Sequence, residues 1–366
     1  MMGNNVPTKV SSYIIHFLSI LAKPQRKHFL TYITGLIFMI KFRSIKEIAK
    51  EYGKGRVDGL HHFLRNSYKK LKDIKERNRE LVARYLNALL VIDDTPCKRN
   101  GKKIEGSGIH YGTGGVIRGL CAVTAILKIG KRRFFWDIQG GCRTKKTCPK
   151  GAFRSKIEIA RQIIIEARRF FRGKLTVMVD AWYACAPVLN PIREAGWTFI
   201  AAIKRNRVVK LDGRRTSIGC LAKGPRRYKT IRVSKKKRFK VAKRVIQLKK
   251  IGVVLLFISK SKEGTRFIIT NDLNMTEREM VKLYSQRTWI EVFHKEIKQH
   301  LGFGEMFMRS WEGVQTHWTL VGIAYNIISL WNGRQSRSFR EMIRHFRDSI
   351  SHDSVIRLPK QLRMAA

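Results

Sequence analysis

The sequence predicts a mixed α/β fold with a helical region at its start, and three features of the 366 residues support this prediction. Up to about residue 85, apolar residues recur at helical spacing. From residue 87, they gather in short β-branched runs that alternate with amphipathic segments, the pattern of a mixed core of strands and helices. Between residues 206 and 262, apolar residues alternate with lysine and arginine, which indicates β-strands inserted into that core.

The first 85 residues are predicted to form a helical, DNA-binding region. The segment "SIKEIAKEYGKGRVDGLHHFLRN" contains a capping Ser44, a turn at Gly53 and Gly55, and apolar stripes on both sides of the turn. Two helices joined by a short turn match the helix-turn-helix outline, although any two packed helices joined by glycines share it. The first helix is predicted from four apolar residues on one face: Ile14, Phe17, Leu18 and Leu21.

The rest of the chain is predicted to form a core in two parts, 86–205 and 263–333, with a basic β-rich insertion at 206–262 and a helical tail at 334–366. Core strands are predicted at "ALLVIDD", "LCAVTAILKIG", "KRRFFWDIQG", "KLTVMVD", "WTFIAAIKR" and "RFIITND". A helix is predicted within 151–172. The glycine-rich "EGSGIHYGTGGVIRG" lacks the Gly-Lys-Ser/Thr ending of a phosphate-binding loop, so it is predicted to be a turn between strands.

The charge of the chain predicts a polyanionic partner. Lysine and arginine number 76 against 26 acidic residues, a formal net charge of +50. Nucleic acid is the simplest partner for such a chain, ahead of an anionic membrane surface. Within the insertion, the basic run Lys235, Lys236, Lys237 and Arg238 is predicted to lie against DNA phosphates. The alternative is a solvated β-insertion that binds nothing.

The cysteines and the apolar runs predict a cytoplasmic protein without zinc. The six cysteines lack CxxC pairs, so six reduced thiols are expected. His16 interrupts the stretch that most resembles a signal peptide. The apolar run "FLTYITGLIFMI" is too short to cross a bilayer, so no membrane association is expected.

A single helix is predicted from Thr276, which forms a capping box with Glu279, to about residue 301. Tyr284, Arg287, Glu291 and Lys298 fall within an arc of roughly 60° on this helix, because an α-helix turns by about 100° per residue. They form one polar stripe opposite an apolar face. An ordinary solvated stripe with an Arg287–Glu291 pair is the alternative.

Three carboxylates suggest a metal site. Asp94 and Asp180 end two predicted buried strands, and the predicted helix could bring Glu291 between them. Two unit charges 4 Å apart repel by about 4 kcal/mol at an effective dielectric constant of 20, so such a cluster needs cations. Hard oxygen ligands favour Mg²⁺ or Mn²⁺. In a chain charged to hold polyanions, the matching reaction is phosphoryl transfer with two metal ions.

The segments "VIDDT", "LTVMVDAWYA" and "YSQRTWIEVFHKEIK" resemble the three catalytic blocks of DDE transposases of prokaryotic insertion sequences. Tyr284, Arg287, Glu291 and Lys298 match the Y-x2-R-x3-E-x6-K signature of one group of these enzymes. The resemblance extends over most of residues 20–333, more loosely at the start. It implies a ribonuclease H-like core with a β-strand insertion between the second aspartate and the glutamate.

The resemblance also implies roles for individual residues. Asp94, which directly precedes a threonine, is expected to be the first catalytic aspartate, with Asp93 as the alternative on the opposite face of the strand. Arg287 and Lys298 are expected to bind phosphates, and Tyr284 the backbone near the cleavage site. Trp182 could stack on an unpaired base, although a core tryptophan is the alternative.

The expected function is therefore that of a transposase, which binds the ends of an insertion sequence, cuts DNA with two Mg²⁺ ions and joins the freed end to target DNA. The active complex is expected to be a homodimer or larger, associated with the nucleoid. The alternatives are a non-catalytic DNA-binding protein, such as a decayed transposase, and a ribonuclease H-like nuclease that hydrolyses DNA without joining it.

Overall fold

The computed structural model describes residues 8–83, 88–101, 103–112, 115–142, 147–223, 227–234, 237–331, 338–352 and 355. The chain forms two compact units. The first comprises Met1–Leu86, Asp94–Ser155 and Val292–Ala366, and the second comprises Asn87–Asp93 and Lys156–Glu291. The boundaries between the units therefore fall inside strand β1 (Leu89–Lys98) and inside helix α10 (Thr288–His300).

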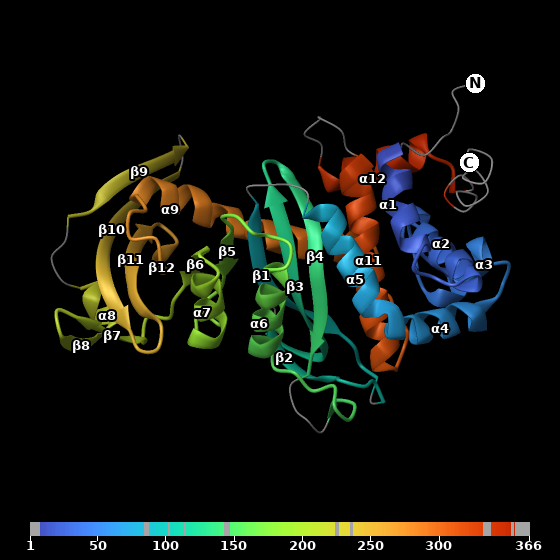
Figure 1. Cartoon of the computed structure of the whole chain (residues 1–366), viewed down its shortest axis with the longest axis horizontal. Coiled ribbons are helices and arrows are strands. Elements are labelled where there is room, and N and C mark those ends of the chain that lie inside the picture. The colour runs from blue at the N-terminus through green and yellow to red at the C-terminus, as the bar shows by residue number, and fades with distance from the viewer. Residues whose placement is uncertain are drawn as a thin grey trace. The chain divides into compact units, whose positions relative to one another are not determined.

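The first unit begins with helices. They are α1 (Thr8–Leu18), α2 (Lys23–Phe38), α3 (Ile45–Tyr52), α4 (Val57–Asn66), the 3₁₀ turn η1 (Ser67–Lys70) and α5 (Leu71–Val82) (Figure 1). The predicted face of the first helix is confirmed, since Ile14, Phe17, Leu18 and Leu21 are buried. Ser44 caps α3 by accepting from the Glu47 backbone, and Gly55 has a φ of 74° in the turn to α4. The predicted pair of helices therefore exists.

Strands and two further helices complete the first unit. The strands are β2 (Gly108–Gly112), β3 (Gly115–Ile129) and β4 (Arg132–Gly141), and the helices are α11 (Trp311–Trp331) and α12 (Phe339–Ser349). β3 pairs antiparallel with both β2 and β4. Helices α5 and α11 pack on β4 and on each other (Figure 1). Helix α12 lies within the predicted helical tail, and its buried face includes Phe339, Met342 and Phe346.

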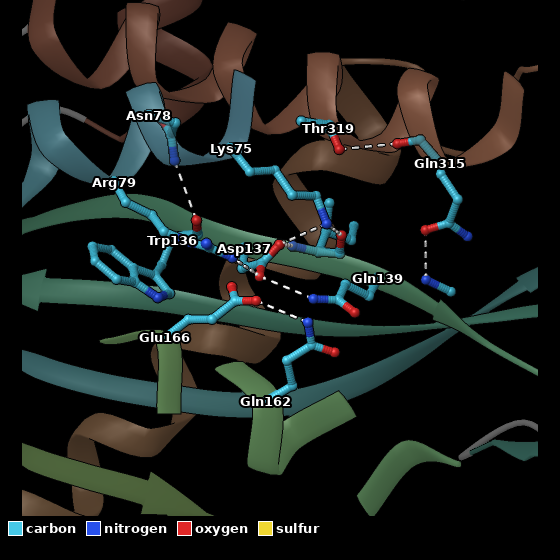
Figure 2. Close-up of polar contacts among 12 residues, drawn as sticks. Lys75, Asn78, Arg79, Trp136, Asp137, Gln139, Gln162, Glu166, Gln315 and Thr319 are labelled. Carbon is cyan, nitrogen blue, oxygen red and sulfur yellow. Dashed lines mark hydrogen bonds and ion pairs between the residues drawn. The ribbon is translucent and has the colours of Figure 1, made fainter. Parts of the chain in front are cut away.

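A buried carboxylate ties α5 to β4 in the first unit. Asp137 is fully buried on β4, and Lys75 and Arg79 of α5 both pair with it (Figure 2). The Lys75 Nζ atom lies 2.8 Å from Asp137 Oδ1. Burial opposes ionisation of the carboxyl, but the two cations outweigh burial and lower its pKa to about 2. The charge of this buried carboxylate is thus compensated within the first unit.

The second unit is built on parallel strands. The first half of β1 pairs in parallel with β5 (Thr176–Val179), which pairs in parallel with β6 (Thr198–Ala202). Helices α6 (Lys156–Ala167) and α7 (Ala186–Glu194) lie between these strands in the chain and pack together. β12 (Gly264–Thr270) extends the sheet antiparallel to β6. The structure is therefore a mixed α/β fold, as predicted.

The segment 206–262 is rich in strands. It contains β7 (Val208–Leu211), β8 (Arg214–Ser217), the short helix α8 (Ile218–Leu221), β9 (Lys229–Ser234), β10 (Lys237–Leu248) and β11 (Gly252–Ser261). β11 pairs antiparallel with β10 and β12, so the segment continues the sheet of the second unit. The unit ends with α9 (Glu277–Tyr284), the 3₁₀ turn η3 (Ser285–Arg287) and the start of α10.

Two local predictions are wrong. The glycine-rich segment is not a simple turn, because it forms β2 and the start of β3. The helix predicted from Thr276 begins with the expected capping box, but η3 divides it into α9 and α10. The Ser285 hydroxyl donates to the Lys282 carbonyl and the Thr288 hydroxyl donates to the Ser285 carbonyl. Such side-chain bonds compete with the backbone bonds of an α-helix, which accounts for the tightened turn.

The prediction of six reduced thiols is also wrong. Cys142 and Cys148 form a disulfide, with Cα atoms 5.8 Å apart. Cys97, Cys121, Cys185 and Cys220 are free thiols. Within the described residues, the structure contains no helix that is both long enough and apolar enough to span a membrane.

Candidate active site

Two aspartates end neighbouring parallel strands in the second unit. Ile92 of β1 lies opposite Val179 of β5. The next residue on each strand is an aspartate, Asp93 on β1 and Asp180 directly after β5. Residues in register on adjacent strands project from the same face. The pairing therefore directs Asp93 and Asp180 to one face at the carboxyl ends of the strands.

Arg287 joins Asp93 to the glutamate of the polar stripe. Its Nη2 atom lies 3.0 Å from Asp93 Oδ2, and its Nη1 atom lies 2.8 Å from Glu291 Oε1. The exposed fractions of the three side chains are 18% for Arg287, 14% for Asp93 and 58% for Glu291. One cation is thus shared by two carboxylates in a partly solvated place.

Asp180 and Tyr284 belong to the same group of residues. Burial raises the pKa of the Tyr284 hydroxyl, Arg287 and Arg266 oppose the rise, and the negative charges of Asp180 and Glu291 add to it. Asp180 Oδ1 accepts from the backbone nitrogens of Trp182 at 2.8 Å and of Tyr183 at 3.3 Å. These bonds hold the carboxylate at the end of β5 and leave Oδ2 without a hydrogen-bond donor among the described residues.

A basic groove begins beside Asp180. Its volume is about 1330 Å³, and its wall includes Trp182. Six basic and no acidic residues of the described chain line it: Lys204, Arg207, Lys210, Arg215, Lys249 and Lys250. The Trp182 side chain is 57% exposed, so the alternative of a core tryptophan is wrong. The Lys204 Nζ atom lies 5.3 Å from the centroid of its ring.

Asp94 and Lys298 lie in the first unit. Asp94 Oδ2 accepts from the Cys121 thiol at 3.2 Å. Burial lowers the pKa of Lys298, and the thiols of Cys97 and Cys121 oppose that change. The different partners of Asp93 and Asp94 agree with the alternation of side chains along β1.

The basic run of the insertion is only partly described. Lys235 and Lys236 lie outside the described residues, and Lys237 begins β10. Arg238 is exposed, opposite Arg232 of β9. Two arginines opposite each other on paired strands repel unless an anion lies between them or water screens them.

The sequence also contained a pattern that favours Asp93, although Asp94 was preferred because it directly precedes Thr95. "LVID" and "VMVD" are apolar runs of equal length that each end in aspartate, and the parallel register aligns them residue by residue. The lysines and arginines of the groove carry no comparable signal, because they come from four separate segments of a chain that is basic throughout.

Carboxylate oxygens have the right chemistry for a divalent metal ion. Asp93 and Glu291 already converge on one positive charge, that of Arg287, which shows that these two side chains can approach a common cation. No three His, Cys, Asp or Glu side chains are grouped as metal ligands within the described part of the chain. The donor set therefore fits a divalent ion only if Arg287 gives up its place between the carboxylates.

Known proteins were compared with the chain. The family described as "Transposase DDE domain" matches residues 152–327. A relative in Microchaete diplosiphon, named as a probable transposase for insertion sequence element IS701, is 24% identical over 294 residues, which cover 77% of this chain and 76% of the relative. The NurA nuclease from Sulfolobus solfataricus aligns with 65% of this chain and 85% of its own, at 14% identity and a TM-score of 0.29.

Two findings thus agree with the catalytic blocks recognised in the sequence. The matched range includes Asp180 and the complete signature from Tyr284 to Lys298. The alignment with the relative covers most of both chains. Both comparisons therefore support a DDE transposase of an insertion sequence.

Proposed function

We propose that the chain binds the ends of its insertion sequence, cleaves DNA there with divalent metal ions, and joins the freed 3′-hydroxyl to target DNA. The observation that carries this proposal is that Asp93 and Glu291 share Arg287, while Asp93 and Asp180 directly follow the paired strand residues Ile92 and Val179. These acidic groups come from two strand ends and one helix of a single unit. A purely structural ion pair would not need a second and a third carboxylate.

The catalytic core is proposed to be ribonuclease H-like. Parallel strands β1, β5 and β6, with antiparallel β12 beside them and helices in the connections, support this assignment. The 206–262 segment would then be an insertion between the second aspartate and the glutamate. Strand ends in such sheets are a usual place for a site, because the connections leave a crevice there.

Asp93 is proposed as the first catalytic carboxylate, in place of Asp94. The sequence favoured Asp94 because of its position before Thr95. Asp93 is better supported because it lies in register with Asp180 and shares Arg287 with Glu291. Asp94, whose carboxylate accepts from Cys121, is proposed to support the strand.

The three carboxylates would hold Mg²⁺ or Mn²⁺, in keeping with the general use of divalent ions in this family. When bound, two such ions activate a water or 3′-hydroxyl for attack and stabilise the leaving oxygen. The backbone bonds to Asp180 Oδ1 fix the direction of its free oxygen. Arg287, once released from the carboxylates, is free to bind a phosphate of the DNA.

The remaining predicted residues are proposed to hold DNA. Lys298 would bind a phosphate, Tyr284 the backbone near the cut, and the run Lys235, Lys236, Lys237 and Arg238 further phosphates. Trp182 is proposed to stack on a base, with the basic groove beside it taking the adjoining phosphates. The active complex is proposed to be a homodimer or larger, associated with the nucleoid.

The decisive experiment measures Mg²⁺-dependent cleavage and joining on duplexes that carry the inverted repeats flanking this reading frame. Asp180→Asn and Glu291→Gln are expected to reduce both reactions by roughly 10³-fold or more, because metal ions contribute several kcal/mol to the transition state. End binding should hold or tighten, since negative charge is removed.

A matched control is Glu194→Gln. Glu194 is 65% exposed and pairs with Arg168, much as Glu291 pairs with Arg287, but it lies on α7. This variant should cleave as the wild type does. Normal cleavage by both Asp180→Asn and Glu291→Gln would contradict the proposed function, and cleavage without joining would make the chain a nuclease.

A further inference from the structure

Arg99 is a buried arginine without a counter-charge. Its residue is 9% exposed and directly follows β1 and Lys98. The Nε and Nη2 atoms are both closed to solvent and donate no hydrogen bond to the described residues. The backbone is held firmly, since Arg99 N donates to Arg118 O at 2.9 Å. The position of this guanidinium is therefore set by the sheet and not by an ion pair.

The other buried arginines of the described chain are paired. Arg43 pairs with Glu305, and Arg79 pairs with Asp137. Arg99 makes no ion pair with a carboxylate of the described residues, although burying an unpaired charge is strongly unfavourable. The ring of Phe307, whose centroid lies 5.4 Å from Arg99 Cζ, compensates for only part of that cost.

A second cation lies near Arg99. Burial raises the pKa of the Cys97 thiol, and the positive charges of both Arg99 and Lys298 oppose that rise. His317, on which Arg99 also acts, is held neutral by burial. Two cations of the first unit thus act on Cys97, and neither forms an ion pair with an acidic residue in the described part of the chain.

The geometry of the Arg99 Nε and Nη2 atoms favours an anion with two adjacent oxygens. Nε and Nη2 form one edge of the planar guanidinium, and that edge matches two oxygens of a phosphate or carboxylate. The Phe307 ring faces the guanidinium, and this residue is 70% exposed and lies in the segment between α10 and α11.

We infer that Arg99, together with Lys298, binds one backbone phosphate of the DNA, and that Phe307 covers this site when DNA is absent. This inference rests on the proposed function, which makes DNA the substrate. It assigns Arg99 as a phosphate-binding residue outside the Tyr284–Lys298 signature. Arg99 directly follows β1, the strand that carries Asp93 and Asp94.

The test compares Arg99→Gln with the wild type in duplex binding followed by fluorescence anisotropy over a range of salt concentrations. The variant should bind about tenfold more weakly at every sequence, with a salt slope lower by roughly one. Its thermal midpoint without DNA should stay equal or rise, because a buried unpaired charge is removed. Lys131→Gln, which removes an exposed cation in the turn between β3 and β4, should retain the wild-type affinity.

A second measurement works even if Arg99→Gln is less stable. Duplexes with a single neutral methylphosphonate are compared one position at a time. At one position the wild type should lose clearly more affinity than Arg99→Gln loses there, and Phe307→Ala should bind as tightly as the wild type or more tightly. If no position distinguishes Arg99→Gln from the wild type, the inference is wrong. If the wild type itself does not bind DNA, the proposed function fails instead.

Discussion

Asp137 in the first unit and Asp93 in the second unit are both strand carboxylates paired with an arginine, yet their surroundings are opposite. Asp137 is fully buried and has two cations, Lys75 and Arg79 (Figure 2). Asp93 is 14% exposed and shares Arg287 with Glu291. In the first case two cations pair with one carboxylate, and in the second one arginine pairs with two carboxylates.

This difference separates a structural cluster from a reactive one. Asp137 is paired with Lys75 and Arg79 and shielded from solvent. Removing one member of this cluster would therefore leave a buried charge without its ion-pair partner. Around Asp93 two carboxylates share Arg287 and one of them, Glu291, is 58% exposed, so a divalent cation can reach the pair from solvent. The same pair of residue types therefore holds the fold in one unit and is suited to chemistry in the other.

The largest expected effect separates the two adjacent aspartates. Asp93→Asn should reduce Mg²⁺-dependent cleavage by roughly 10³-fold, equivalent to about 4 kcal/mol, because it removes a metal-binding charge. Asp94→Asn should cleave within a few-fold of the wild type, and thermal unfolding should show neither variant to be greatly destabilised. An inactive Asp94→Asn beside an active Asp93→Asn would restore the assignment made from the sequence.

The buried cluster should respond in stability and not in chemistry. Asp137→Asn is expected to lower the free energy of unfolding by about 3–5 kcal/mol, because Lys75 and Arg79 remain buried without their partner. Urea unfolding measures this loss, with Glu194→Gln as an exposed control expected to change by less than about 0.5 kcal/mol. If Asp137→Asn lowered the free energy of unfolding as little as the control does, the cluster around Asp137 would have to be accessible to water.

Acid should weaken the first unit through His317. Burial, aided by the positive charge of Arg99, lowers the pKa of this histidine to about 3. Its folded pKa lies below its ordinary value of about 6.5, so its contribution is complete above pH 6.5 and is lost as the pH falls toward 3. The loss should reach about 3 kcal/mol near pH 4. His317→Gln should lack this part of the pH dependence, and identical profiles would refute the assignment.

The smallest expected effect concerns the insertion. Replacing Lys235, Lys236, Lys237 and Arg238 with glutamine should weaken duplex binding by about tenfold, or about 1.4 kcal/mol, at all sequences alike. The thermal midpoint should not fall, because phosphate contacts form only when DNA is bound, and Arg238 is exposed. Unchanged affinity in a filter-binding titration would mean that this run is only a solvated loop.

By itself, the sequence determined the features that depend on neighbours along the chain. The cap at Ser44, the capping box at Thr276 and the buried face of the tail helix follow from local spacing, which fixes helix ends and faces. Glu291 and Arg287 were also predicted as a pair, because residues four apart on a helix face each other. Helix α11 was not predicted, because it is apolar on nearly every side and therefore lacks the alternation of apolar and polar faces that marks an amphipathic helix.

Only the tertiary structure decided which distant residues meet. The register of β1 against β5 brings Asp93 level with Asp180, and a shift of one residue would have directed Asp94 to that face instead. The disulfide between Cys142 and Cys148, the basic groove beside Trp182 and the unpaired burial of Arg99 likewise depend on strand pairing and packing. Strand register and burial are set by contacts between segments far apart in the chain. The local periodicity of the sequence therefore does not predict them.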